Sequence, residues 1–309
     1  MMTKGKKNKN FTKLTISLLK VLLIILFFGF SVYALKLIIN TNDNKVVSLS
    51  SDTITYFIEE ADKASLPKEQ LDWQEIAAIE GVLDNKFTTY NSAETEKIAK
   101  MFYDNNSKVK SLETVISDLK LSSWERRNVY LNLGKINNQS IRNITGGEDS
   151  EKDNFIQSIK DASIQNYKQN KIFPSITIAQ AILESEWGKS DLASKYNNYF
   201  GIKADKSWKG QVVSFSTKEN YNDVIKANFR AYTNIYDSIF DHGKFFSENE
   251  RYTKNGVFDA NNYIEQASAI ENAGYSTVKD KSGNLIYSEM IISIIKENNL
   301  MLIDKESEK

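Results

Sequence analysis

Apolar side chains recur at spacings of three and four residues along most of the chain, which is the period of an amphipathic α-helix. In the first half, beyond residue 50, this pattern predicts five helices, at residues 54–64, 73–83, 92–103, 108–119 and 123–133. Pro67 fits a turn or a first helical position ahead of the second helix. Residues 51–140 are therefore predicted to form a small all-α domain.

The pattern changes after a polar stretch at 137–153, which contains two adjacent glycines and several acids and is the predicted domain boundary. Residues 211–217 alternate with period two and residues 227–232 do so weakly, which predicts a β-hairpin. Further helices are predicted at 154–169, 175–187, 236–246, 260–272 and 287–299, and the charged tail after residue 304 is expected to fray. Residues 150–303 thus form a predicted α+β domain that is mostly helical, with a small hairpin lobe.

Residues 14–39 form a mainly apolar run that follows a basic, acid-free stretch at residues 1–13. With two lysines as its only charges, the run reaches the ~20 residues that a helix needs to span a bilayer. The positive-inside rule places residues 1–13 in the cytoplasm, so the chain after a polar linker at 40–50 is expected outside the membrane. The alternative is a signal peptide cleaved near Ala34, which would give a secreted protein.

The charge balance and the residue types of the chain exclude several kinds of partner and metal site. The 40 basic residues balance the 40 acidic ones, so no overall field favours a nucleic-acid partner. The chain has no cysteine and a single histidine, which excludes a thiolate zinc site and a multi-histidine metal site. That histidine, His242, is expected to be structural, and no metal or organic cofactor is expected.

One predicted helix carries a candidate acid. Residues three and four apart are neighbours on a helix, so one side of the helix at 175–187 carries Ile176, Gln180, Leu183, Glu184 and Trp187. A carboxyl desolvated by apolar neighbours has a raised pKa and can stay protonated near neutral pH as a general acid. Glu186 points elsewhere on the helix and is expected to be solvated. The spacing alone leaves open a structural role for Glu184, in a cap or an ion pair.

Two runs around this acid resemble a known family. Residues 173–190 read Phe-Pro-Ser-Ile-Thr-Ile-Ala-Gln-Ala-Ile-Leu-Glu-Ser-Glu-Trp-Gly-Lys-Ser, and residues 197–203 read Asn-Asn-Tyr-Phe-Gly-Ile-Lys. Together they resemble the signature of the glucosaminidases of glycoside hydrolase family 73. Matching segments follow in order at 213–219, 228–232, 238–242 and 273–277. The resemblance covers about residues 150–300 and implies a lysozyme-like domain that cleaves the β-1,4 bond after N-acetylglucosamine in peptidoglycan.

The resemblance also implies roles for individual residues. Glu184 matches the catalytic acid, and Glu219 matches a second carboxylate that acts as base on the attacking water. Tyr275 matches a tyrosine that lines the cleft and supports catalysis, although a core tyrosine after a helix end fits the spacing as well. The chain departs from the family at Glu186, where a small residue is usual. It also departs after Glu219, where Asn-Tyr-Asn-Asp replaces an aromatic residue and a glycine turn, so Asp223 is an alternative base.

The aromatic and amide residues near these motifs are candidates for substrate binding, because aromatic faces pack against sugar rings. Four are expected in the cleft, whereas Trp187 is assigned to the core: Asn198, Tyr199, Phe200 and Tyr232.

The domain at 51–140 lies outside the resemblance and is predicted to be a spacer or a protein-docking module. Glu80 could be a further lysozyme-type acid, but an amphipathic helix explains the same segment, with its apolar residues toward the core: Trp73, Ile76, Ala77 and Ile79.

These features together predict a membrane-anchored β-N-acetylglucosaminidase that acts on the glycan strands of peptidoglycan outside the cell. Two alternatives share the fold, a muramidase and a lytic transglycosylase, since both use a helix-borne glutamate. A third is an inactive glycan-binding scaffold that recruits partners through residues 51–140.

Overall fold

The structure, a computed structural model, describes residues 49–83, 91–145, 150–219 and 223–307, with the backbone alone described for residues 140–145, 150, 216–219 and 223–225. The predicted membrane segment at 14–39 lies outside these ranges. Within them, no helix is both long enough and apolar enough to cross a membrane. Residues 48–309 group into one compact unit.

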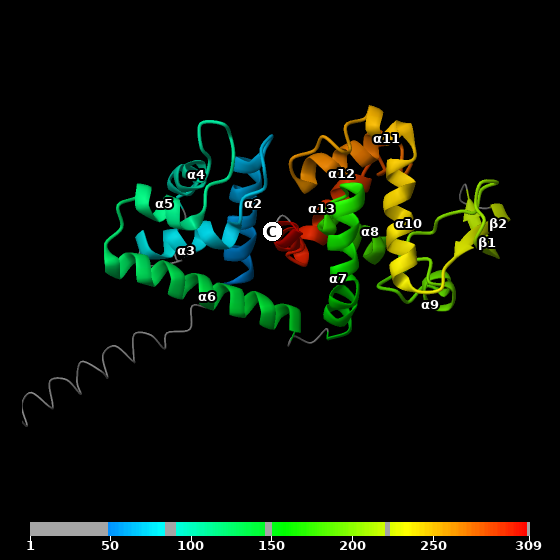
Figure 1. The fold of residues 1–309 in the computed structure, drawn as a ribbon, viewed down its shortest axis with the longest axis horizontal. Coiled ribbons are helices and arrows are strands. Elements are labelled where there is room, and N and C mark those ends of the chain that lie inside the picture. Colours follow the sequence, from blue (N-terminus) through cyan, green and yellow to red (C-terminus); the bar gives the residue numbers. More distant parts are fainter. Residues whose placement is uncertain (1–48, 84–90, 146–149, 220–222, 308–309) are drawn as a thin grey trace, which may run out of the picture. The chain divides into compact units, whose positions relative to one another are not determined.

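The described residues of the first half of this unit form helices, as predicted, with one isolated β-bridge between Tyr103 and Val109. It consists of α2 (Ser51–Ser65), α3 (Trp73–Leu83), α4 (Ser92–Met101), α5 (Leu112–Asp118) and α6 (Ser123–Thr145). Helix α3 packs against α2, α4 and α6 (Figure 1). Its apolar residues are buried: Trp73, Ile76, Ala77 and Ile79. Glu80 of α3 is also buried, and its carboxylate accepts a hydrogen bond of 2.7 Å from the Thr95 hydroxyl. This placement gives Glu80 a structural role.

The second half contains the remaining elements. They are α7 (Ser150–Asn170), α8 (Pro174–Ser185), α9 (Asp191–Tyr196), β1 (Gln211–Glu219), β2 (Asp223–Ala231), α10 (Ile235–Ser247), α11 (Glu250–Lys254), α12 (Tyr263–Asn272), α13 (Tyr287–Glu297) and α14 (Met301–Ser307). Helix α8 packs against α7, α12, α13 and α14, and every residue from Pro174 to Ile182 is buried. Its apolar surface on all sides explains this central position.

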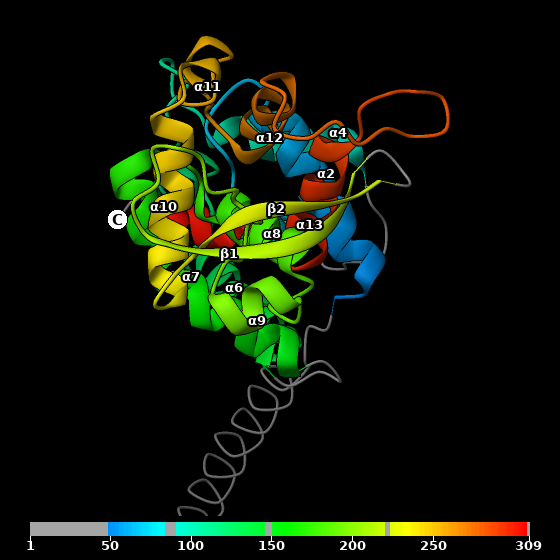
Figure 2. The same ribbon diagram turned by 90° about the vertical axis from the view of Figure 1, so that its right-hand side faces the viewer.

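The predicted hairpin is present. Strands β1 and β2 are antiparallel, and Gln211 pairs with Ala231 while Glu219 pairs with Asp223 (Figure 2). The backbone of β2 also bonds to the preceding loop, since Arg230 N donates to the Ile202 carbonyl over 3.0 Å. The hairpin is therefore attached to the helical body along its second strand.

The end of helix α8 differs from the prediction. The helix ends at Ser185 rather than at Trp187, because Glu186, Trp187 and Gly188 all have positive φ, at 53°, 60° and 78°. Trp187 therefore leaves the stripe of Glu184 and packs its ring edge-on against Phe155.

The predicted frayed tail after residue 304 is wrong. Helix α14 runs to Ser307, and Asp304 is buried, where its carboxylate accepts bonds of 2.8 and 2.6 Å from the Ser175 backbone N–H and hydroxyl. A carboxylate at the N-terminus of α8 satisfies exposed N–H groups and interacts favourably with the helix dipole. The tail is ordered by this long-range contact, which a local charge pattern does not reveal.

Partly buried ionic contacts connect the two halves. Asp62 of α2 accepts a hydrogen bond of 2.7 Å from the Tyr263 hydroxyl and forms an ion pair of 2.9 Å with Lys296. Lys305 of α14 pairs with both Asp72 and Glu75. These contacts tie the first helices to the helices that carry part of the site.

Candidate active site

Glu184 lies in the last turn of α8, where the helix leaves the core. Its side chain is accessible to solvent, yet it is surrounded by enough protein for desolvation to raise its pKa. A hydrogen bond of 2.9 Å from the Tyr287 hydroxyl to Oε1 opposes this rise, and desolvation is the larger of the two effects. The raised pKa extends the pH range in which Glu184 holds a proton, which is what a general acid needs.

Tyr287 was not among the predicted site residues. It is the first residue of α13 and is buried, and its hydroxyl also accepts a hydrogen bond of 3.0 Å from Gln180 Nε2. Its partner Glu184 is 103 positions away in the chain. The one local signal was a tyrosine at the start of a predicted helix, which reads equally well as a core residue.

Gln180 is buried one turn before Glu184 and connects Tyr287 to the histidine. Its Oε1 lies 3.0 Å from His242 Nε2, and His242 is fully buried on α10. Burial lowers the pKa of His242 to about 3, so the ring is neutral at physiological pH. The single histidine is therefore part of the structure behind Glu184, without a position from which to touch a substrate.

An aromatic cluster surrounds these groups. Phe200 stacks on the His242 ring at 3.8 Å between centroids, and Phe246 stacks on Tyr275 at 5.5 Å. Tyr275 lies 5.3 Å from the Tyr287 ring. Burial, followed by the charge of Glu184, raises the pKa of Tyr275 well above its ordinary value, so this phenol stays protonated beside the acid. The structure thus brings Glu184, Tyr275 and Tyr287 together from three separate segments.

Three of the four predicted substrate-binding residues are buried. The Asn198 amide donates to the carbonyls of Ile202 and Arg230 and accepts from the Ile202 N–H, so its hydrogen bonds are made within the fold. Phe200 and Tyr232 are 4% and 7% exposed. Direct contact between a sugar and these three side chains is not supported by this placement, because they are covered by protein. Tyr199 is half-exposed and keeps the prediction of a cleft position.

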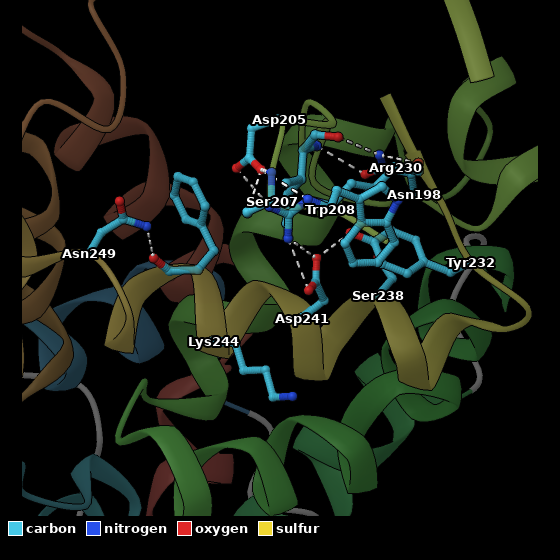
Figure 3. Close-up of polar contacts among 12 residues, drawn as sticks. Asn198, Asp205, Ser207, Trp208, Arg230, Tyr232, Ser238, Asp241, Lys244 and Asn249 are labelled. Atoms are coloured by element: carbon cyan, nitrogen blue, oxygen red, sulfur yellow. Dashed lines mark hydrogen bonds and ion pairs between the residues drawn. The ribbon is translucent and has the colours of Figure 1, made fainter. Parts of the chain in front are cut away.

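A polar cluster fixes the hairpin on α10 (Figure 3). The Arg230 guanidinium on β2 donates to both oxygens of Asp241 on α10, at 3.0 and 2.8 Å, and to Asp205 at 3.2 Å. It also covers the ring of Trp208 at 4.6 Å. Tyr232 donates to Asp241 over 2.5 Å, and burial followed by that carboxylate raises its pKa, which keeps its hydroxyl protonated as a donor. Both bonds to Asp241 come from Nη1, while Nη2 bonds Asp205, so the guanidinium links the hairpin to two other segments.

The two candidate bases lie at the end of the hairpin. The backbone pairs Glu219 with Asp223, and their side chains lie outside the described part of the structure. The choice between them stays a prediction. Among the residues whose side chains are described, no group of three or more His, Cys, Asp or Glu could hold a metal ion.

Comparisons with known proteins point to one family. Residues 160–300 match the model of the family described as Glucosaminidase, mannosyl-glycoprotein endo-beta-N-acetylglucosaminidase. Exo-glucosaminidase LytG of Bacillus subtilis is 38% identical over 152 residues, which are 47% of this chain and 51% of the relative. Peptidoglycan hydrolase FlgJ of Vibrio cholerae is 35% identical over 129 residues, 40% of this chain and 38% of the relative.

Two further similarities complete the comparison. A probable N-acetylmuramidase of Lactococcus lactis is 31% identical over 157 residues, which are 50% of this chain and 35% of the relative. The solved glycoside hydrolase domain of FlgJ from Salmonella typhimurium covers 50% of this chain and 92% of that domain, at 27% identity and a TM-score of 0.39. The chain spans about half or less of the length of these curated relatives.

Proposed function

Because residues 160–300 form a domain of the glucosaminidase family, we propose that this chain is a peptidoglycan hydrolase that cleaves the β-1,4 bond after N-acetylglucosamine. The observation that carries the proposal is the carboxyl of Glu184, which is open to solvent, has a pKa raised by desolvation, and receives a hydrogen bond from Tyr287. The relatives named as an exo-glucosaminidase and as peptidoglycan hydrolases support the same substrate.

In the proposed mechanism, Glu184 donates its proton to the glycosidic oxygen while the bond from that oxygen to the anomeric carbon breaks. The leaving sugar takes the proton and the bonding electron pair, and Glu184 becomes a carboxylate. The hydrogen bond from Tyr287 stabilises this new charge. The anomeric carbon then receives a water activated by Glu219 or Asp223, or is attacked first by the acetamido oxygen of the substrate.

A muramidase is the second candidate, because one relative is named a probable N-acetylmuramidase. A lytic transglycosylase would use the same acid and need no second carboxylate. Mass spectrometry of peptidoglycan digested by the full chain in detergent separates the three. Reducing-end N-acetylglucosamine is the expected product, whereas reducing-end N-acetylmuramic acid would indicate a muramidase. Anhydro-muramic acid would refute the proposal in favour of a transglycosylase.

Two proposals concern the rest of the chain. The apolar run at 14–39 is proposed to anchor the protein in the membrane with the catalytic domain outside the cell, and residues 51–140 to dock a protein partner or act as a spacer. Retention of the mature protein in the detergent phase of a phase-separation experiment is expected. Complete release into buffer, with a new N-terminus near Ala34, would indicate secretion instead.

A further inference from the structure

A continuous chain of hydrogen bonds leads from the interior of the domain to Glu184. His242 Nε2 lies 3.0 Å from Gln180 Oε1, Gln180 Nε2 lies 3.0 Å from the Tyr287 hydroxyl, and that hydroxyl lies 2.9 Å from Glu184 Oε1. Gln180 and His242 are completely buried. Water cannot reach the contacts among His242, Gln180 and Tyr287 without a change of structure, so each proton position along these contacts fixes the next.

The charge of Glu184 sets the direction of the chain. An ionised carboxylate can only accept, so Tyr287 must donate to it. The hydroxyl has one hydrogen, so its oxygen accepts from the Gln180 amide nitrogen. The amide oxygen of Gln180 then faces His242, whose Nε2 must carry the ring proton. Every donor in the chain therefore points toward Glu184.

The surroundings of His242 disfavour the opposite direction of donation along this hydrogen-bond chain. The neutral ring of His242 has its second nitrogen, Nδ1, buried without a hydrogen-bond partner. Phe200 and Phe246 pack on the ring. If the chain were reversed, Nδ1 would carry a buried N–H with no acceptor, and orphaned N–H groups are rarer in proteins than unpaired acceptors. The observed direction leaves only a lone pair unpaired.

We infer that Gln180 and His242 are positioning residues that hold Tyr287 as a one-way donor to Oε1 of Glu184, so that the proton given to the substrate resides on Oε2. The inference rests on the proposed role of Glu184 as the acid. Within the described structure, no hydrogen bond occupies Oε2. The chain thus keeps one oxygen in contact with the protein and leaves the other for the reaction.

The groups that act on Glu184 limit how a pH experiment is interpreted. Tyr287 from α13 donates to it, and Tyr275 from the loop after α12 interacts with its charge. Arg251 and Tyr252 act on Tyr275 in turn. The pKa values of Tyr275 and Tyr287 are raised well above the ordinary value, chiefly by burial, so neither phenol ionises near neutral pH. A change in the pH profile near neutrality therefore reports on Glu184.

The first test is the tautomer of His242, because the chain has a single histidine. In the full chain in detergent, with ¹⁵N-labelled histidine, two-bond correlation spectra distinguish the ring nitrogens, since Nε2 correlates with both carbon-bound ring protons. A neutral ring with its proton on Nε2 is expected at every pH, acid or alkaline, at which the protein is folded. A proton on Nδ1, or a ring that titrates near neutral pH, would overturn the inference whether or not the protein hydrolyses glycan.

The second test is a set of variants assayed by the pH profile of kcat. Tyr287→Phe removes the donor that lowers the pKa of Glu184, so the alkaline limb should move to higher pH and kcat should fall on the order of tenfold. Gln180→Met and His242→Phe should move the limb in the same direction by less. His242→Gln keeps an N–H donor and should restore most of the wild-type profile. Ile239→Ala, which removes buried packing one turn before His242 on α10 without removing any of these hydrogen bonds, should lower thermal stability and leave the limb unchanged.

These outcomes separate two failures. If the wild-type protein releases no glycan fragments, the proposed function fails. The tautomer of His242 still decides whether the hydrogen bonds run in the stated direction. If the wild type is active and the Gln180→Met and His242→Phe profiles match that of Ile239→Ala, the positioning role is refuted.

Discussion

Replacing Glu184 by glutamine tests the proposed chemistry with little change in shape. The amide oxygen can still accept the hydrogen bond from Tyr287, and the side chain is open to solvent, so the fold should be preserved. The amide has no acidic proton to give to the leaving oxygen. General acid catalysis contributes about 10²- to 10⁴-fold, which corresponds to roughly 3–5 kcal/mol of transition-state stabilisation. We expect kcat to fall by that factor while KM changes little.

The assay is the release of reducing ends from purified peptidoglycan, with sedimentation of the protein with insoluble glycan as a measure of binding. Glu186→Gln is the matched control, because Glu186 is exposed two residues further on. Its activity should stay within about twofold of the wild type, as is usual for a surface change. Glu184→Gln with more than a tenth of wild-type activity would refute the mechanism. Equal losses in both variants would show that the effect is one of local charge or folding.

The remaining predictions concern stability. The folded-state pKa of Glu184 is raised, so ionisation of this carboxyl destabilises the fold as pH rises through that pKa. Glu184→Gln should therefore have a higher Tm than the wild type at pH 8 and the same Tm at pH 4. A lower Tm for the variant at pH 8 would contradict the desolvation argument. Arg230→Met removes the charge that pairs with the partly buried Asp241 and should cost about 3 kcal/mol in urea unfolding. Arg230→Lys should not restore the stability, because an ammonium does not reproduce a planar guanidinium that bonds both Asp241 and Asp205 and covers the Trp208 ring. Asp304→Asn should cost about 1–2 kcal/mol, since the charge at the N-terminus of α8 and one strong bond to Ser175 are lost; an unchanged urea midpoint would indicate that the tail contributes nothing.

Tyr287 changes the description of the site that the sequence suggested. The family motifs directed attention to Glu184, Glu219 and Tyr275, and the structure adds a phenol that bonds the acid directly. The same phenol, through Gln180, connects the acid to the single histidine, which the sequence analysis expected to be structural. The pKa of Glu184 is raised by burial, and Tyr287 is the group that opposes the rise; Glu186 is not among the causes.

Much of the fold follows from the sequence alone. Apolar spacing predicted α3, α7, α10 and α13 within a few residues, and period-two alternation predicted β1 and β2. These patterns work because residues three and four apart share a helix face and alternate residues share a strand face. The candidate acid Glu184 could also be predicted from local sequence, since its helix, its apolar stripe and the motif around it lie within one run of the chain.

The tertiary structure decided which groups meet. The bond from Tyr287 to Glu184 joins residues 103 positions apart, and the bond between His242 and Gln180 joins residues 62 apart. Packing likewise buried Asn198, Phe200 and Tyr232, which local sequence had suggested for the cleft, and ordered the tail through Asp304. Periodicity reports only the face on which a residue lies. The element that covers that face, and therefore the hydrogen bonds and desolvation that set the properties of Glu184, depends on contacts between distant segments.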